Sequence, residues 1–477
     1  MRNQRSRQFV GTRRRFDRRA EEGPSRVVPR SNHTALPSPK RHDGQQHAQH
    51  VQHAPHHDHP RRFALRTSLV VAILITLLTF ITVAFAVDPV RDAATLQPIG
   101  EASLSRPTSY LAIEPVSSVL DTVTLLTVAQ HIALVIWVIV LFAIARIVLA
   151  RSRSTTARRE VWASLALLGA IFLTYAAAAM LPRPMAQLET SDPGVLVADF
   201  HAHTKYSHDG RSGWSEDDVR EWHRAAGFDL ALITDHATFE GAERGVASNP
   251  PQAGQGTLIL QGLEAFYRGE HVNILNAGRR YKGITTPDLK DVDEQSLMIA
   301  SLLVQTAPVL IETMPGNLSK VVAAAPGQAG MSAIEIVDGS PRGLSQTRRD
   351  RQRIIHLADS LNLALVTGSD NHGWGRTAPG WTLLAIPGWR GMTADSISRI
   401  VEDILRVGRR DGTKTAERVV AGGTTATGLV FALPAIAWRM FTTLSADERV
   451  AWMIWTWGLV LIGRAVRRYR VRPSIAT

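Results

Sequence analysis

Three long stretches of the chain contain no Asp, Glu, Lys or Arg: Thr67–Val87, Thr122–Ala145 and Val161–Pro182. Each reaches the length of about 20 residues that a helix needs to cross the hydrocarbon core of a bilayer. They therefore predict three transmembrane helices. Val419–Trp438 is also uncharged and predicts a fourth, whereas the shorter, tryptophan-rich Val450–Gly463 favours an interfacial helix.

The basic residues indicate the orientation of these helices in a cell (inner) membrane. Residues 1–62 form a basic, His-rich tail without apolar periodicity, and Arg146–Arg159 is a second basic segment, so both are expected on the cytoplasmic side. Three crossings then place residues 190–395 outside the cytoplasm, and the fourth returns Arg464–Arg472 to the inside. The alternative is a cytoplasmic location of 190–395, because the basic segment 396–418 otherwise lies outside.

The net charge of +12 lies mainly in the terminal tails. It therefore favours the lipid bilayer as a partner and argues against nucleic acid, whose binding requires a basic face on the folded domain. The chain has no cysteine, which excludes disulfides. The sequence leaves the oligomeric state open.

Between residues 195 and 386 the chain alternates short apolar runs with helical stretches. Runs such as Leu230–Thr234 and Leu363–Thr367 have the length and composition of parallel strands that are buried on both faces. Helical segments are expected between such strands, at 215–226, 295–306 and 345–361. The pattern predicts an α/β domain in which the C-terminal ends of the strands carry the chemistry.

Histidines and carboxylates follow several of these runs. His201 and His203 are separated by one residue at the end of an apolar run, so both imidazoles face the same side of a strand and are able to bind one ion. Further candidate ligands lie downstream at His208, Asp209, His236, Glu264, His271, Asp370 and His372. Such a set of imidazole and carboxylate groups predicts a metal centre.

These motifs and their order resemble the PHP (polymerase and histidinol phosphatase) domain family of metal-dependent phosphoesterases. The similar segments are Asp199–Thr204 with Ser207–Gly210, then Ile233–His236, then Glu264 and His271, and finally Gly368–His372. The resemblance covers about residues 195–390. It implies a distorted seven-stranded (β/α) barrel, attached here to α-helical transmembrane segments.

The resemblance also implies how the ligands are shared among ions. One ion is expected on His201, His203, Glu264 and Asp370, a second on His236 and His372 with either His208 or Asp209, and a third on Glu264 and His271. The expected divalent metals are zinc or manganese, with iron as a further option. Met314 stands where the family usually has a histidine, so both two and three ions per chain remain open, and Glu312 is a candidate replacement.

Divalent ions at such a centre activate water and stabilise the attacking and leaving oxygens of a phosphate ester, so a phosphorylated substrate is implied. Arg376 is the strongest candidate to grip the phosphate, ahead of Lys205 and Arg211. The implied catalytic residues are then His201, His203, Asp370 and Arg376. Two alternatives remain: a metal-binding sensor that signals through the membrane helices, and a metal-dependent hydrolase of a non-phosphate bond.

Three further residues are expected to have non-catalytic roles. His223 and His356 lie in charged helical stretches and are expected to be solvated. Glu335 lies inside an apolar run, where a carboxylate is costly unless it is paired, so it is expected to support a ligand or to form an ion pair within the barrel.

These expectations divide the chain into six parts. They are the disordered tail (1–62), three transmembrane helices (63–185), the PHP-like domain (190–395), a basic linker (396–418), a fourth transmembrane helix (419–440), and an interfacial helix with a basic tail (450–477).

Overall fold

The computed structural model describes residues 59–152, 155–236, 238–267, 269–275, 308–314, 316–325, 330–419 and 426–471, all within the unit His59–Thr477. The predicted tail lies outside the described residues up to position 58, and the helix predicted at 295–306 lies outside them entirely. Helix α1 begins at His59, so residues 59–62 of the predicted tail are helical.

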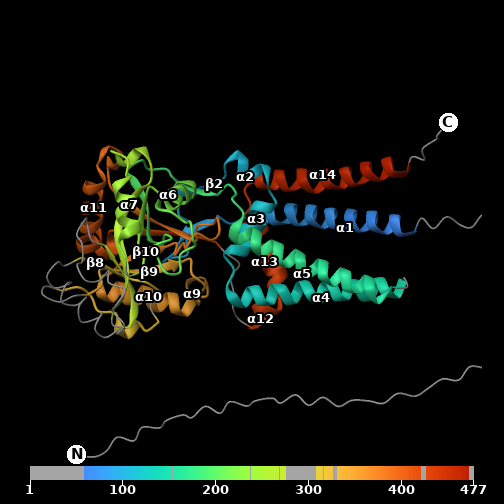
Figure 1. The fold of residues 1–477 in the computed structure, drawn as a ribbon, viewed down its shortest axis with the longest axis horizontal. Helices are drawn as coiled ribbons and strands as arrows, with labels where there is room; N and C mark the ends of the chain where they lie inside the picture. Colours follow the sequence, from blue (N-terminus) through green and yellow to red (C-terminus); the bar gives the residue numbers. More distant parts are fainter. Residues whose placement is uncertain are drawn as a thin grey trace, which may run out of the picture. The chain divides into compact units, whose positions relative to one another are not determined.

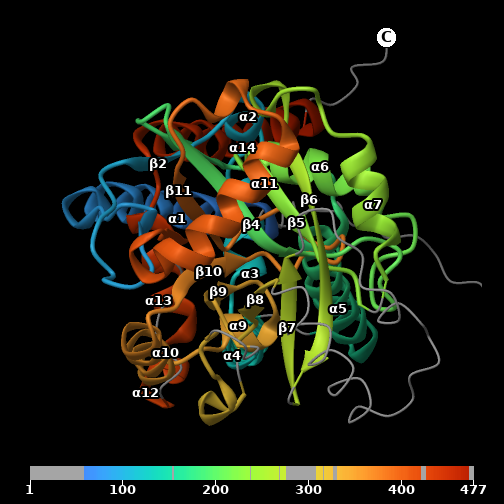
Figure 2. The same cartoon turned by 90° about the vertical axis from the view of Figure 1, so that its left-hand side faces the viewer.

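The folded domain is a mixed α/β structure around one large sheet (Figures 1 and 2). Its ten strands have the order β1-β12-β11-β4-β5-β6-β7-β8-β9-β10. They are β1 (Val90–Asp92), β4 (Val195–Ala202), β5 (Leu230–Ile233), β6 (Leu258–Tyr267), β7 (Glu270–Leu275), β8 (Val309–Glu312), β9 (Ala333–Asp338), β10 (Ala364–Gly368), β11 (Gly380–Ala385) and β12 (Lys414–Arg418). A separate two-stranded sheet pairs β2 (Ala102–Ser105) with β3 (Gln187–Thr190).

The sheet curls so that β4 and β10 come together. Ala202, at the end of β4, forms a parallel bridge with Asn371, just beyond β10, and the backbone N–H of Asp370 donates to the His201 carbonyl at 2.9 Å. The predicted count of seven strands is not matched, because β11, β12 and β1 extend the sheet beyond β4. The sheet is also not wholly parallel: β7 is antiparallel to both of its neighbours, and its short connection to β6 at Gly269 can join only antiparallel strands.

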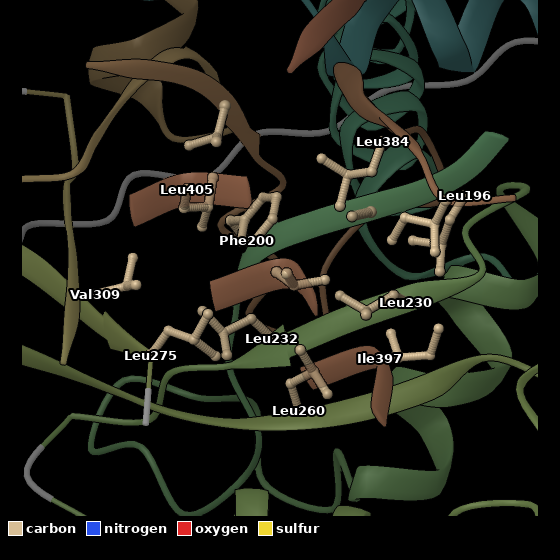
Figure 3. Close-up of a cluster of buried hydrophobic side chains, with 14 of the residues drawn as sticks. Leu196, Phe200, Leu230, Leu232, Leu260, Leu275, Val309, Leu384, Ile397 and Leu405 are labelled. Carbon is tan, nitrogen blue, oxygen red and sulfur yellow. The ribbon is translucent and has the colours of Figure 1, made fainter. Parts of the chain in front are cut away.

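One side of the sheet packs against the chain that follows β11. Figure 3 shows Leu196, Leu230 and Leu260 gathered with Ile397 and Leu405 in a single apolar cluster. The strand residues are fully or almost fully buried, which explains why their runs read as continuously apolar in the sequence.

The segment 396–418, predicted to be a basic linker, is instead part of the folded domain. It contains most of α11 (Ala394–Asp403), a π-helical turn η5 (Ile404–Gly408), the 3₁₀ turn η6 (Arg409–Asp411) and β12. Ile397, Val401 and Leu405 recur every fourth residue and are buried, whereas Arg399 is exposed. The spacing of these apolar residues is that of an amphipathic helix, and the many basic residues of the segment concealed this pattern in the sequence.

The other helices of the domain cover the sheet and its ends. They are α6 (Glu216–Ala225), α7 (Glu240–Ala247), α9 (Pro341–Leu344), α10 (Arg348–Leu361), and the 3₁₀ turns η2 (Ala253–Gln255), η3 (Leu318–Lys320) and η4 (Trp389–Gly391). The helices predicted at 215–226 and 345–361 correspond to α6 and α10. A capping box between Ser215 and Asp218 fixes the start of α6, because each side chain accepts a hydrogen bond from the other residue's backbone N–H.

Three helices are long and apolar enough to cross a membrane: α1 (His59–Ile81), α4 (Val128–Ser152) and α5 (Ala157–Met180). They match the three predicted transmembrane segments in position. Between α1 and α4 lie a 3₁₀ turn η1 (Thr82–Phe85) and the short helices α2 (Thr108–Ala112) and α3 (Val116–Thr124).

The fourth transmembrane helix predicted at 419–440 is not continuous. Its described part is divided into α12 (Ala426–Val430) and α13 (Ala432–Thr442), each far shorter than the roughly 20 residues of a span. Pro434, in the first turn of α13, has no N–H to donate to Val430, and the Trp137 indole donates to that carbonyl instead at 2.9 Å. The proline therefore accounts for the break.

The predicted interfacial helix is longer than its apolar stretch suggested. It is part of α14 (Ala446–Val471), whose 26 residues extend about 39 Å at about 1.5 Å per residue. α14 lies against α1, where the Trp457 indole donates to the Thr76 hydroxyl at 3.2 Å and Arg449 donates to the Thr79 carbonyl at 2.8 Å.

Candidate metal centre

Four side-chain atoms converge at the end of β4. The Nε2 atoms of His201 and His203 are 3.0 Å apart, Oε2 of Glu264 lies 3.0 and 3.2 Å from them, and Oδ1 of Asp370 lies 3.3 Å from each. In a tetrahedral site with metal–ligand distances of about 2.0 Å, neighbouring ligand atoms lie about 3.3 Å apart. The two imidazole nitrogens lie at about this spacing from each other and from each carboxylate oxygen, and His201, His203 and Asp370 form one group that could hold a divalent ion.

The backbone around β4 and β10 fixes these ligands. The His203 N–H donates to the Asn371 carbonyl at 3.0 Å, and the Ser369 hydroxyl donates to the His201 carbonyl at 3.0 Å. Asp370 itself has a left-handed backbone with φ of 47°, a conformation that is costly for a residue with a side chain. The contacts on both sides hold Asp370 in this conformation, which turns its carboxylate towards the two histidines.

A second group of ligands lies beside the first. Oδ2 of Asp209 is 3.1 Å from Nε2 of His372 and 3.6 Å from Nε2 of His236, and His236 is 3.4 Å from Oε2 of Glu264. Burial lowers the pKa of His236 to about 4, so its ring is neutral at pH 7. Although burial raises the pKa of Asp209, the Ser207 hydroxyl and the nearby His372 lower it to about 2, which keeps the carboxylate ionised.

Glu264 joins the two groups and reaches His271. Its Oε1 lies 2.6 Å from Nδ1 of His271, while its Oε2 faces the first group and His236. Both residues left open in the sequence are exposed: Asp209 lies 3.1 Å from Nε2 of His372, and His208, whose ring centroid is 4.9 Å from that of His236, forms a group with Asp209 and His236 that could hold an ion. All nine predicted ligands therefore lie in one connected cluster.

Glu335 contacts a candidate ligand from behind, as predicted for a buried carboxylate. It is fully buried on β9, and its Oε1 lies 3.0 Å from Nδ1 of His201. Asp338 on the same strand is buried 3.7 Å from that nitrogen. A carboxylate on the remote ring nitrogen orients an imidazole so that Nε2 faces the ion. Asp338 was missed in the sequence, although it follows Glu335 at the end of the same apolar run.

Gly368 has no side chain, and this absence leaves room for the contact between Glu335 and His201. A Cβ on Gly368 would lie 2.5 Å from Oε1 of Glu335 and 2.6 Å from Cβ of His201. We expect Gly368→Ala to reduce both metal content and the midpoint of thermal unfolding, because overpacking of this kind costs about 1–3 kcal/mol. Gly391→Ala is the matched control, since no atom lies within 4 Å of its added Cβ. Equal behaviour of the two variants would contradict the expectation.

Metal binding is expected to release protons. Burial by itself lowers the pKa of His203, but hydrogen bonds with Asp370 and Glu264 raise it to about 9 in the protein without metal. The ring is then protonated below pH 9, whereas a ligand must be neutral. The apparent affinity for a divalent ion should therefore rise with pH up to about 9. Calorimetric titration at pH 7.5 in buffers of different ionisation enthalpy measures the proton release, and identical enthalpies in all buffers would exclude it.

His223 is buried, contrary to the prediction that it is solvated. Its Nε2 lies 2.7 Å from Oδ2 of Asp199, and the other oxygen of that carboxylate accepts the Ser369 N–H at 2.8 Å. The pair therefore links α6 to the β10 loop. Val219 and Trp222 on the same helix face are also buried, and this periodicity was the signal for the burial of His223. His356 is exposed, as predicted.

Arg376, the arginine predicted to bind phosphate, does not contact the candidate ligands in the described residues. Nε of Arg376 donates to the Arg183 carbonyl at 3.2 Å, and within the described residues no contact joins Arg376 to a candidate ligand. Arg211 lies next to the cluster: its N–H donates to the His372 carbonyl at 3.0 Å and its guanidinium donates to the Gly373 carbonyl at 3.2 Å. Lys205 is exposed over the ring of Tyr206.

Met314 does not point its sulfur at the described ligands. The thioether accepts a hydrogen bond from Gln346 at 3.4 Å and packs in an apolar cluster that includes Leu310 and Ile336. Glu312 is buried at the end of β8, but within the described residues no metal-competent group includes it. Within the described part of the chain, neither Met314 nor Glu312 therefore supplies a metal ligand in place of the missing histidine.

No protein-family model and no curated protein matches the chain. Among solved structures it is similar to PsfC from Pseudomonas syringae, at 18% identity and a TM-score of 0.31, over 51% of this chain and 98% of that one. It is also similar to a candidate metal-dependent phosphoesterase from Bifidobacterium adolescentis (17%, TM-score 0.27, 44% and 96%) and to an amidohydrolase from Chromobacterium violaceum (14%, TM-score 0.26, 43% and 96%). TM-scores this low support no statement about the site. Its own geometry does: side chains of β4, β6 and the β10 loop form groups able to hold metal ions.

Proposed function

We propose that the chain is a membrane-anchored, metal-dependent phosphoesterase. The observation that carries the proposal is the convergence of two adjacent ligand groups, one on His201 and His203 and the other on Asp209 and His372, with Glu264 between them. Adjacent divalent ions suit phosphate esters because they stabilise both the attacking and the leaving oxygen. The resemblance of the motifs to the PHP family supports the same reaction.

The residues of the chain would divide the reaction as follows. His201, His203 and Asp370 would hold one ion, Asp209, His236 and His372 a second, and Glu264 would face both. A divalent ion held there would lower the pKa of a bound water to about 7 and so supply a nucleophile at neutral pH. Glu335 fixes the ring of His201, and Arg211 is the described cation best placed to bind the outer phosphate oxygens.

The membrane arrangement is also a proposal. With the basic tail in the cytoplasm, α1, α4 and α5 would cross the membrane three times and leave the catalytic domain outside. α14 would take the place of the fourth span predicted at 419–440: it is long enough to cross and lies against α1, although among the described helices only α1, α4 and α5 are both long and apolar enough by composition. It would return the C-terminal arginines to the cytoplasm.

The proposal is tested by metal content and by hydrolysis of an aryl phosphate with the full chain, purified in detergent and supplied with Mn²⁺ or Zn²⁺. The full chain is needed because β1 and β12 lie outside residues 190–395. Two or more ions per chain, with turnover that a chelator abolishes, are expected. Bound metal without turnover on any phosphate ester would favour the sensor or a hydrolase of another bond, and absence of bound metal would overturn the proposal.

A further inference from the structure

We propose that the substrate is a phosphate ester in the headgroup of a membrane lipid. This inference rests on the proposed phosphoesterase function and narrows its substrate class. It follows from the position of the ligand loop after β10 relative to the end of α5, together with the side chains that surround the open side of the cluster.

The loop that carries Asp370 and His372 is attached directly to the last turn of a membrane helix. The Gly375 N–H donates to the Ala179 carbonyl at 2.7 Å, and Arg376 donates to the Arg183 carbonyl just beyond the helix. A Cβ on Gly375 would also lie 3.3 Å from Cγ2 of Thr124, at the end of α3. The ligand loop thus lies against the end of α5.

The distance from this helix end to the ligands is short. His372 precedes Gly375 by three residues, so their Cα atoms are at most about 11 Å apart at about 3.6 Å per residue. Met180 and Leu181 at the end of α5 are exposed apolar residues, as expected for side chains that face lipid. The headgroup layer extends about 5–8 Å beyond the hydrocarbon core on each side. The candidate metal centre would therefore lie close to the depth of lipid phosphates.

The open side of the cluster carries an aromatic residue and a cation. Among the candidate ligands, Asp209 and His271 are well exposed, with side chains 40% and 42% exposed. Trp374, two residues after His372, is 49% exposed, and the Arg211 guanidinium lies 5.2 Å from its ring centroid. Tryptophan concentrates at membrane–water interfaces, and arginine binds phosphate with paired hydrogen bonds. Both features suit an anionic headgroup.

The activity test compares one headgroup with and without its lipid chains. The full chain is reconstituted in phosphatidylcholine vesicles that contain phosphatidic acid, and its kcat/KM is compared with those for glycerol 3-phosphate and an aryl phosphate. We expect phosphatidic acid to be preferred over glycerol 3-phosphate by about a hundredfold, because confinement to the bilayer raises the effective concentration. Equal rates on the free phosphates and the lipid would overturn the lipid proposal alone, whereas metal loading without turnover on any of the three would overturn the phosphoesterase proposal as well.

A second measurement tests the depth of the site without activity. Because the chain has no cysteine, Trp374→Cys introduces a single site for a spin label. Asp395→Cys is the matched control: it is exposed on α11, at the end of the domain away from α5 (Figures 1 and 2). We expect the label at 374 to be relaxed more by oxygen, which partitions into lipid, and the label at 395 more by a water-soluble nickel complex. Equal access of the nickel complex to both labels would overturn the proposal.

Discussion

His201→Ala and Asp370→Ala are expected to abolish both metal loading and turnover. Nε2 of His201 lies 3.0–3.3 Å from the other three candidate ligand atoms, and Oδ1 of Asp370 lies 3.3 Å from both imidazole nitrogens, so each change removes a ligand from the site. Substitution of a residue that only hydrogen-bonds to a metal ligand costs about 10–100-fold in metal affinity or activity. Loss of a ligand itself should therefore cost more. Elemental mass spectrometry and hydrolysis of an aryl phosphate measure the two effects.

The controls separate loss of the site from loss of the fold. His356→Ala changes an exposed histidine on α10 and should keep both metal and activity. Asp370→Ala is more informative than His201→Ala, because removal of His201 also takes away the imidazole that contacts Oε1 of the buried Glu335 and so lowers stability. Full activity in an Asp370→Ala protein that unfolds at the same temperature as the parent would remove the catalytic proposal.

The ligands could be predicted because they follow a simple rule. His201 lies at the end of β4, His236 and Asp370 follow shortly after β5 and β10, and a curled sheet brings the ends of its strands together. The choice between His208 and Asp209 could not be predicted, because adjacent residues in a turn point in directions that only the surrounding structure decides. Asp209 is directed at His372 by its hydrogen bond with Ser207.

The strand count could not be predicted because it depends on distant pairing. Val90–Asp92 looks like part of a loop between two membrane helices, yet it pairs with Lys414–Arg418, more than 300 residues later. Ion pairs of Glu417 with Arg91 at 2.7 Å and with Arg351 at 2.5 Å accompany this pairing. Short strands of this kind carry too few apolar residues to be recognised by alternation.

Loss of the Asp121 carboxylate is expected to destabilise the junction between the helices and the domain. Asp121 is 2% exposed, and its oxygens lie 2.5 Å from Arg183 and 2.8 Å from Arg418, which follow α5 and end β12. Thr377, in the loop after His372, donates to the same carboxylate at 2.9 Å. The Asp121 side chain on α3 therefore links the segment after α5, the end of β12 and the ligand loop.

Asp121→Ala would leave two arginines facing each other without their shared carboxylate, and breaking a buried ion pair in this way costs about 3–5 kcal/mol. Glu240→Ala removes a solvent-exposed ion pair with Arg244 and is the matched control, with an expected cost of about 0–1 kcal/mol. Denaturant unfolding in detergent measures both. Despite burial, Arg418 and Arg183 lower the pKa of Asp121, so its contribution is present above the ordinary pKa of 3.8 and is lost as the pH falls through the lowered value. The destabilisation should therefore be seen in full at neutral pH, and a variant as stable as Glu240→Ala there would show that the junction does not depend on this carboxylate.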